Sequence, residues 1–544
     1  MRTSRRSFLQ ASAAVASGLV TARLGFEPRV ARASGMPKKL LTIYVPGGWM
    51  PSYFFVPLSK AGVTKLMTAT PGTIPVVNNS APGGFTASMV RTLADGADFD
   101  PGPNAASQPL RVPQMWDEAS LAAGQPDSRG ENPLSEQKGL PTRPHGWAWK
   151  QYKLWEQCVV VHGVDQQTAA HESGVISMMS GAAGPNYRAP SLHSVVANHF
   201  FGATKDQRAV PCVSVGGAPV PNSYNLPAAA AATTVGSLDS LTNLLSDRSD
   251  YQWKGLRDRA LRDVEDYAGQ PAGSINATLL EAYSLEAARR HRGTTTDATD
   301  QLLQRLHDGL GDVSKLVARD VVSQLEKTKG LDYLLTNRPF WASGAKERPF
   351  VVDQFGYDVD DVWKDSFDLA LRFLKSNLSS SVALSCPGPG NFFFDTHGAA
   401  AGQHFVKLWP TFEVIGRLLG EMKNSPGTSG DGGSLLDETL VVIWSEFART
   451  WPNAGDHWPT TSVVFAGGGV AQNRMLGGYD EVAFGPGQSP TGLPVSLLGE
   501  GGDKVSRVPT SGDVVFTALR ALDIESKDFF IPGGPGEILG VRNA

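Results

Sequence analysis

Short apolar segments rich in β-branched residues are the feature that most constrains how this chain can fold. Six such segments read as strands, and their residues are apolar at consecutive positions, not only at alternate ones. A strand that is apolar on both faces is typical of a parallel sheet covered by helices on both sides. The six predicted strands are residues 40–45, 158–162, 210–215, 381–385, 440–444 and 462–466.

Helical patterns lie between these strands, most clearly at 365–378 and 405–423. Alternation of strands and helices predicts an α/β fold, a doubly wound and mostly parallel sheet flanked by helices. Two stretches interrupt the alternation. Residues 61–144 are rich in Pro, Gly, Ser and Asn and predict a loop-rich insertion, whereas 274–335 have helical periodicity and predict a helical subdomain. Residues 424–433 predict a surface loop.

The N-terminus has the pattern of a twin-arginine signal peptide. Arg5-Arg6 is followed by an apolar pair and then by a small-residue segment, 11–20, that is too short to span a bilayer. Ala31-Arg32-Ala33 offers a signal peptidase site. We expect a leader over 1–33 and a mature domain over 34–544 without a transmembrane segment. The twin-arginine export machinery would then be a partner, and the location periplasmic or secreted. The alternative is a basic tail on a cytosolic protein.

Composition limits the classes of function. The formal net charge is -4, so the chain offers no strongly basic surface, and we do not expect nucleic acid as a partner. The three cysteines form no CxxC pair, so one disulfide is conceivable but no cysteine framework is. Cys158 and Cys212 stand in apolar segments and are predicted to be buried thiols. Without a GxGxxG after the first strand or a CxxCH motif, an oxidoreductase is not favoured.

Three clusters of polar residues can carry chemistry, and each follows a predicted strand. Ligands of open α/β sheets bind outside the carboxyl ends of strands, which is where these clusters stand. Carboxylates beside histidines are the mixture that binds zinc or manganese. The clusters are His171-Glu172-Ser173, then Asp395-Thr396-His397, and then Glu446 and Arg449 with Asp456-His457.

Each cluster also has a plain structural reading. An Asp-x-His or Asp-His pair can be a hydrogen-bonded pair on a loop. Glu446 can form an ion pair with Arg449 at the end of its strand. His171 and Glu172 can begin a helix, where the helix dipole favours the carboxylate. His162 lies inside an apolar segment and is predicted to be a core residue.

Taken together, the motifs resemble a known family. The leader, the run Phe394-Asp395-Thr396-His397, the run from Trp444 to Arg449 and Gly455-Asp456-His457 are similar to the bacterial domain-of-unknown-function 1501 family. That family is grouped with the alkaline phosphatase and sulfatase superfamily. The resemblance extends over most of the mature chain, including Thr510 to Asp513 leading into a helix. It implies an alkaline phosphatase-like sheet with a metal site at the strand ends.

The resemblance also implies roles for individual residues. The metal ligands would be Asp395, His397, Glu446 and His457, and Arg449 would stabilise developing anionic charge. His171 falls where the superfamily has its nucleophile, and Ser173 is the nearest hydroxyl. Two departures from the superfamily pattern argue for one metal ion or none. Pro46-Gly47-Gly48 follows the first strand where an aspartate is expected, and Phe447 replaces a histidine.

Two functions follow as expectations. The first is an exported, metal-dependent hydrolase of phosphate or sulfate esters, acting on a small molecule or a polysaccharide. The second is a non-catalytic secreted binding or assembly protein on the same scaffold. The missing aspartate favours the second function. Aromatic residues in the loops also favour it, as a surface for carbohydrate or protein, although aromatic residues more commonly serve in packing. These aromatic residues are Trp49, Tyr53, Phe54, Phe55, Trp147 and Trp149.

Overall fold

A computed structural model gives the fold of a large part of the chain. The predicted leader, 1–33, and most of the two predicted insertions, 61–144 and 274–335, lie outside the described residues. The structure describes residues 37–49, 58–59, 90–92, 107–108, 111–113, 149, 152–182, 189–203, 208–220, 226, 230–238, 321–331, 359–386, 394–395, 401–430, 432–449, 456–476, 478–483, 490–494, 508–525, 531 and 534–542.

A nine-stranded mixed sheet forms the centre of the molecule. Five adjacent strands, from β8 to β10, are parallel to one another. β13 then runs antiparallel to both β10 and β6, β14 is parallel to β6, and β4 is antiparallel to β14. In spatial order the strands are β4 (Ser107–Gln108), β14 (Arg474–Leu476), β6 (Cys158–Asp165), β13 (Thr460–Gly467), β10 (Thr439–Trp444), β1 (Lys39–Tyr44), β9 (Ser381–Ser385), β7 (Cys212–Val215) and β8 (Thr233–Val235).

All six predicted strands lie in this sheet, which confirms the mostly parallel α/β architecture. β4 shows that the predicted insertion at 61–144 is not loop alone, since it adds a strand to one edge of the sheet. The remaining strands form three small sheets. These pair β11 (Ala448–Arg449) with β12 (His457–Trp458), β3 (Val90–Thr92) with β5 (Arg111–Pro113), and β15 (Gly478–Ala483) with both β16 (Pro490–Pro494) and β2 (Leu58–Ser59).

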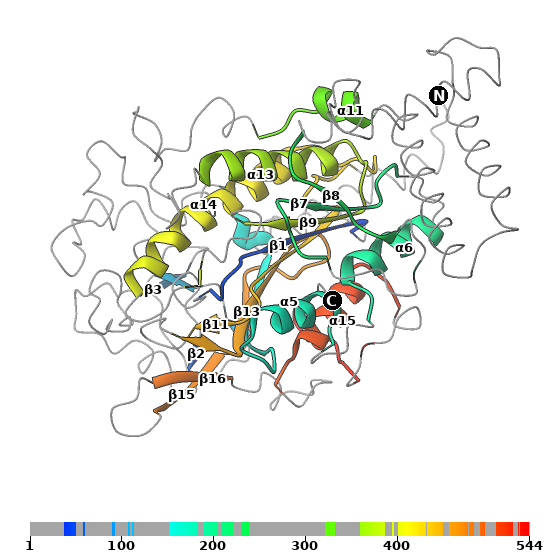
Figure 1. Cartoon of the computed structure of the whole chain (residues 1–544). Coiled ribbons are helices and arrows are strands. Elements are labelled where there is room, and N and C mark those ends of the chain that lie inside the picture. Colours follow the sequence, from blue (N-terminus) through cyan, green and yellow to red (C-terminus); the bar gives the residue numbers. More distant parts are fainter. Residues whose placement is uncertain are drawn as a thin grey trace, which may run out of the picture.

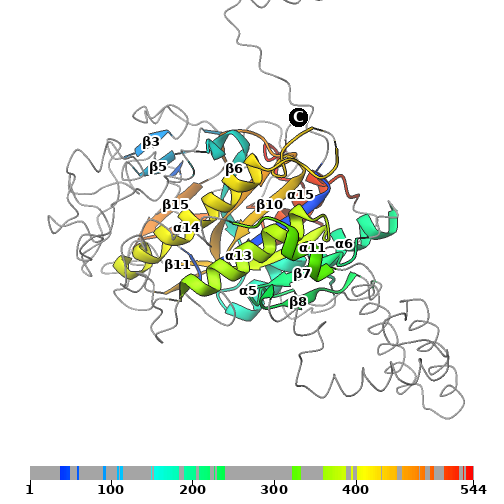
Figure 2. The same ribbon diagram turned by 90° about the horizontal axis from the view of Figure 1, so that it is seen from above.

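Helices cover both faces of the main sheet (Figures 1 and 2). Alternate residues of β1 point to opposite faces: Leu41 and Ile43 enter one apolar core, and Leu40 and Tyr44 enter the other. The first core is closed by α11 (Val321–Lys327), α13 (Val359–Lys375) and α14 (Ala401–Asn424), and the second by α5 (His171–Ser180), α6 (Leu192–Ala203) and α15 (Ser511–Ala521).

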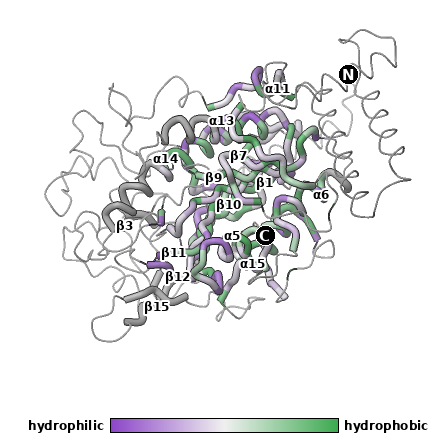
Figure 3. The backbone as a smooth tube through the Cα atoms, in the orientation of Figure 1, coloured by the Kyte–Doolittle hydropathy of each residue, from purple (hydrophilic) through white to green (hydrophobic). Residues whose placement is uncertain are grey.

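The interior is apolar, as the strand sequences predict, and Figure 3 shows hydrophobic residues concentrated along the central strands. Cys158 and Cys212 are buried free thiols, which confirms their predicted burial, and the third cysteine, Cys386, is also buried and free. His162 is a core residue whose Nδ1 lies 2.6 Å from the Ser462 hydroxyl. None of the helices within the described residues is both long and apolar enough to cross a membrane.

The parallel strands place their carboxyl ends along one edge of the sheet. β9, β1 and β10 are adjacent and parallel, so the segments that follow them emerge side by side. β6 ends at this edge as well, because Asp165 pairs with Thr460 at the start of β13. At this edge the structure brings together one residue from each of the three sequence clusters, His171, Asp395 and His457.

Candidate metal centre at the carboxyl edge of the sheet

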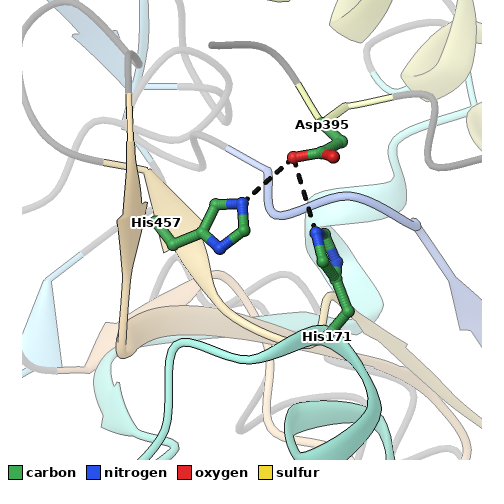
Figure 4. A group of neighbouring side chains, drawn as sticks. All are labelled: His171, Asp395 and His457. Carbon is green, nitrogen blue, oxygen red and sulfur yellow. Dashed lines mark hydrogen bonds and ion pairs between the residues drawn. The ribbon is translucent and has the colours of Figure 1, made fainter.

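His171, Asp395 and His457 converge at the carboxyl edge of the sheet (Figure 4). One ligand atom from each of them lies within 4.8 Å of the other two. The Asp395 Oδ1 is 3.0 Å from the His457 Nε2 and 3.5 Å from the His171 Nε2. The side chains of His171, Asp395 and His457 are 21%, 27% and 19% exposed, so solvent reaches part of each residue, whereas the Nε2 atom of His171 is itself buried.

His171 is the first residue of α5, which follows β6 after a short turn. The helix docks on the segment after β10 because Gly174 has no side chain: a Cβ there would lie 2.5 Å from the Glu446 carbonyl oxygen. His171 and Gly174 are three residues apart and therefore share a helix face. This close packing fixes the N-terminus of α5 beside the ends of β1 and β10.

Asp395 follows β9 and is held against the segment after β1. The Phe394 N–H donates to the Pro46 carbonyl oxygen at 3.0 Å. Gly47 has φ of 102°, and a Cβ there would lie only 2.3 Å from the Asp395 nitrogen. Gly47 stands in the segment where the superfamily pattern would have an aspartate after the first strand. Because it has no side chain, its backbone can lie directly against the backbone of Asp395.

The environment of Asp395 favours its ionised form. Burial, the largest single influence, raises its pKa. Hydrogen bonds from Arg449 and His457, with the charges of Arg449 and His171, outweigh burial and lower the pKa of Asp395 to about 2. Asp395 is therefore a carboxylate at neutral pH and can act as an anionic ligand.

His457 reaches the group through a short ribbon. β11 and β12 pair antiparallel, with Arg449 opposite His457. The His457 Nδ1 is 2.9 Å from the Ala169 carbonyl oxygen. A carbonyl oxygen only accepts hydrogen bonds, so this nitrogen carries a hydrogen, and Nε2 is the nitrogen that faces Asp395.

The spacing of the three atoms fits a divalent transition metal. Zinc binds histidine nitrogen and carboxylate oxygen at roughly 2.0–2.2 Å, and a tetrahedral arrangement separates such ligands by roughly 3.3–3.5 Å. The Asp395 Oδ1 lies 3.0 Å from the His457 Nε2 and 3.5 Å from the His171 Nε2, close to this spacing. A small adjustment of side chains would therefore bring all three ligand atoms to one cation.

Glu446 lies outside this three-residue group, although we predicted it as a ligand. Its side chain is fully buried, and its Oε1 lies 2.7 Å from the Nδ1 of His171. It stands behind His171, on the side of the imidazole opposite the convergence point. The alternative reading, an ion pair between Glu446 and Arg449, also differs from the structure, because Arg449 pairs with Asp395.

Arg449 is fully buried, and its guanidinium binds the protein itself. Nη2 donates to the carbonyl oxygens of Gly47 and Phe394 and to the Asp395 carboxylate, and Nε donates to the carbonyl oxygen of Gly48. We predicted that Arg449 would stabilise anionic charge on a substrate. Its contacts instead tie the segments after β1 and β9 to β11 and orient Asp395.

The other predicted site residues have different outcomes. His397 lies outside the described residues, so its predicted role as a ligand stays a prediction. Ser173 lies in the first turn of α5, two positions after His171. Its predicted role as the hydroxyl nearest to the nucleophile position also stays a prediction.

The sequence did not identify the groups that frame the site. Phe447 packs against both imidazoles, with ring centroids 4.7 Å from His171 and 4.4 Å from His457. It forms an apolar wall on one side of the cluster. Two backbone groups also frame the site: the Gly47 N–H donates to Glu446, and the Ala169 carbonyl oxygen accepts from the His457 Nδ1. Gly47 and Gly48 after the first strand are the sequence signal that could have indicated such close backbone contacts, but they were interpreted only as the absence of an aspartate.

Comparison with known families gives one match. Residues 366–494 match the family described as "Protein of unknown function (DUF1501)". The matched segment extends from α13 to β16 and includes Asp395, Glu446, Arg449 and His457, whereas His171 lies before it. Among curated proteins, none is significantly similar in sequence to this chain.

Proposed function

We propose that this protein is an exported, metal-dependent hydrolase of phosphate or sulfate esters that uses one divalent cation. The observation that carries the proposal is the convergence of His171, Asp395 and His457 from three distant parts of the chain. Two imidazole nitrogens and one carboxylate oxygen form a ligand set suited to zinc or manganese. Three protein ligands leave a coordination position for a substrate or water.

The chemistry of the proposed site divides between the cation and the chain. A bound divalent cation would polarise the ester and make a water molecule more acidic. The chain would hold Asp395 in its ionised form through Arg449 and His457. Phe447 would exclude water from one side of the cluster and leave the other side for the substrate.

The start of α5 supports an anionic substrate. The first N–H groups of a helix carry partial positive charge and bind anions such as phosphate or sulfate. Ala170 precedes the helix and provides no side-chain cap for these groups. Because His171 begins α5, an ester bound at the cluster would lie beside this positive end.

The family match and the sheet support a relationship to the alkaline phosphatase and sulfatase superfamily, and the sequence pattern of a twin-arginine leader supports export. In such a protein a mostly parallel sheet with its site at the carboxyl edge is the expected arrangement. The substrate would be an ester of a small molecule or a polysaccharide, in the periplasm or outside the cell.

The mature chain, stripped of metal with a chelator, tests this function on a panel of aryl phosphate and aryl sulfate esters. We expect hydrolysis only after zinc or manganese is restored, and a loss of about 100-fold or more in kcat/KM for His457→Ala. His199→Ala removes an imidazole on α6, outside the cluster, and should keep its activity. Turnover that persists without metal, or in His457→Ala, would contradict the proposal. Stoichiometric metal without turnover on any ester would instead favour the binding or assembly protein.

A further inference from the structure

Glu446 is a fully buried carboxylate directly after β10, and three donors surround it. Its Oε1 accepts the Gly47 N–H at 2.7 Å and lies 2.7 Å from the His171 Nδ1. Its Oε2 accepts the Ser445 hydroxyl at 2.9 Å. Both oxygens are therefore engaged by the protein, and neither belongs to the group of convergent ligand atoms.

The contact with Glu446 determines the tautomer of His171. A carboxylate only accepts hydrogen bonds, so the His171 Nδ1 carries a hydrogen and donates it. In neutral His171 the lone pair is then on Nε2, the nitrogen that is 3.5 Å from the Asp395 Oδ1. His457 has the same arrangement through the Ala169 carbonyl, so the two imidazoles present the same nitrogen to the convergence point.

Backbone groups keep Glu446 in place. The Ser445 hydroxyl oxygen accepts the N–H groups of Gly48 and Trp49, each at 3.2 Å, which leaves its hydrogen for Glu446. Gly47 supplies a further N–H. The segment after β1 thus surrounds the carboxylate with fixed donors, and a side chain held in this way has little freedom to turn toward a cation.

We propose that Glu446 is a positioning residue: it fixes the ring and the tautomer of His171 from behind and is not itself a metal ligand. This inference rests on the proposed function in one respect: the arrangement serves to direct a lone pair of His171 at a bound cation. The tautomer of His171 is a property of the metal-free chain and can be measured without any hydrolysis.

Nitrogen NMR of the metal-free mature chain, labelled with ¹⁵N-histidine, tests the tautomer at a pH where the imidazoles are neutral. The His171 signals are assigned by their loss in His171→Gln. We expect the wild type to show His171 with hydrogen on Nδ1, Glu446→Gln to keep this tautomer through its amide oxygen, and Glu446→Leu to shift it toward Nε2–H. Unchanged signals of the buried His193 report that each variant is folded. Wild-type His171 with hydrogen on Nε2, or Glu446→Leu identical to wild type, overturns the proposal.

A titration with Co²⁺ alone, followed by visible absorption, separates positioning from ligation. A positioning role predicts that Glu446→Leu, which loses the hydrogen bond to His171, binds Co²⁺ about 10–100-fold more weakly, because loss of such partners weakens metal sites by that factor, while the absorption band keeps its shape. A changed band shape would make Glu446 a ligand and overturn the inference. If the wild type binds no Co²⁺, the proposed function fails, and the NMR measurement still decides the role of Glu446.

Discussion

At Asp395 a single carboxylate oxygen is shared by three nitrogen-bearing side chains. Arg449 donates to Oδ1, His457 lies 3.0 Å away and His171 3.5 Å away. The guanidinium is buried, so its contact with the carboxylate is poorly screened by water and salt. Asp395 therefore connects the ion pair with Arg449 to the two imidazoles, and these contacts outweigh burial and lower its pKa to about 2.

His193 is a histidine outside the cluster whose pKa is set by burial. It is fully buried, with Nε2 at 2.7 Å from the Thr42 hydroxyl and Nδ1 at 2.7 Å from the Ser381 hydroxyl. Burial lowers the pKa of His193 from 6.5 to about 3. No charged side chain contributes to this shift, so the folded protein holds a neutral imidazole between β1 and β9.

The stability of the fold should therefore fall as pH decreases below about 6.5. The unfolded chain binds a proton on His193 near pH 6.5, whereas the folded chain resists it down to about pH 3. Each pH unit in this window removes up to about 1.4 kcal/mol from the free energy of unfolding. Urea unfolding at pH 7.5 and pH 5 measures it, with His193→Gln as the matched variant. Equal pH dependence in both proteins would show that His193 does not titrate in this way.

At the scale of the element, α5 positions His171 because it packs closely on Glu446 in the segment after β10. Gly→Ala inside a helix normally stabilises by about 1 kcal/mol. At Gly174 the new methyl group would meet the Glu446 carbonyl oxygen at 2.5 Å, and backbone cannot move aside as a flexible side chain can. We expect Gly174→Ala to lower the free energy of unfolding by about 1–3 kcal/mol and to displace His171.

Ser173→Ala is the control for this prediction, because it changes the neighbouring position of the same helix without approaching β10. Its free energy of unfolding should stay within about 0.5 kcal/mol of the wild type. Thermal or urea unfolding of the two variants gives the comparison. A Gly174→Ala protein as stable as the wild type would mean that α5 does not depend on this close contact.

Six strands of the main sheet were predictable, because a strand that is buried on both faces has apolar residues at consecutive positions. The segment at 381–385 was predicted with the bounds that β9 shows, and the others differ at their ends by a few residues. β13 extends beyond its predicted start to Thr460, since polar threonines there are buried by pairing with β6. Polar residues at strand ends weaken the hydrophobic signal, so strand ends are predicted less well than strand centres.

At the scale of the whole molecule, the topology determines which polar residues meet. Residues 171, 395 and 457 are separated by hundreds of positions or by whole elements, yet parallel strands deliver all three to one edge. The sequence predicted this edge and the residue types. It did not show that His171 is in the ligand group and that Glu446 stands behind it. The positions of His171 and Glu446 depend on how α5 packs against Glu446 at Gly174. This is a tertiary contact, which a local sequence pattern does not indicate.

Anomalous diffraction from crystals of the mature protein grown with zinc or manganese tests the central claim most directly. We predict one strong peak in the cluster, at roughly 2.0–2.2 Å from the Asp395 Oδ1 and from the Nε2 atoms of His171 and His457. The Glu446 carboxylate should lie outside bonding distance of this peak. Crystals grown with excess metal that show no peak in the cluster, or a peak bonded to Glu446 in place of His171, would contradict the claim.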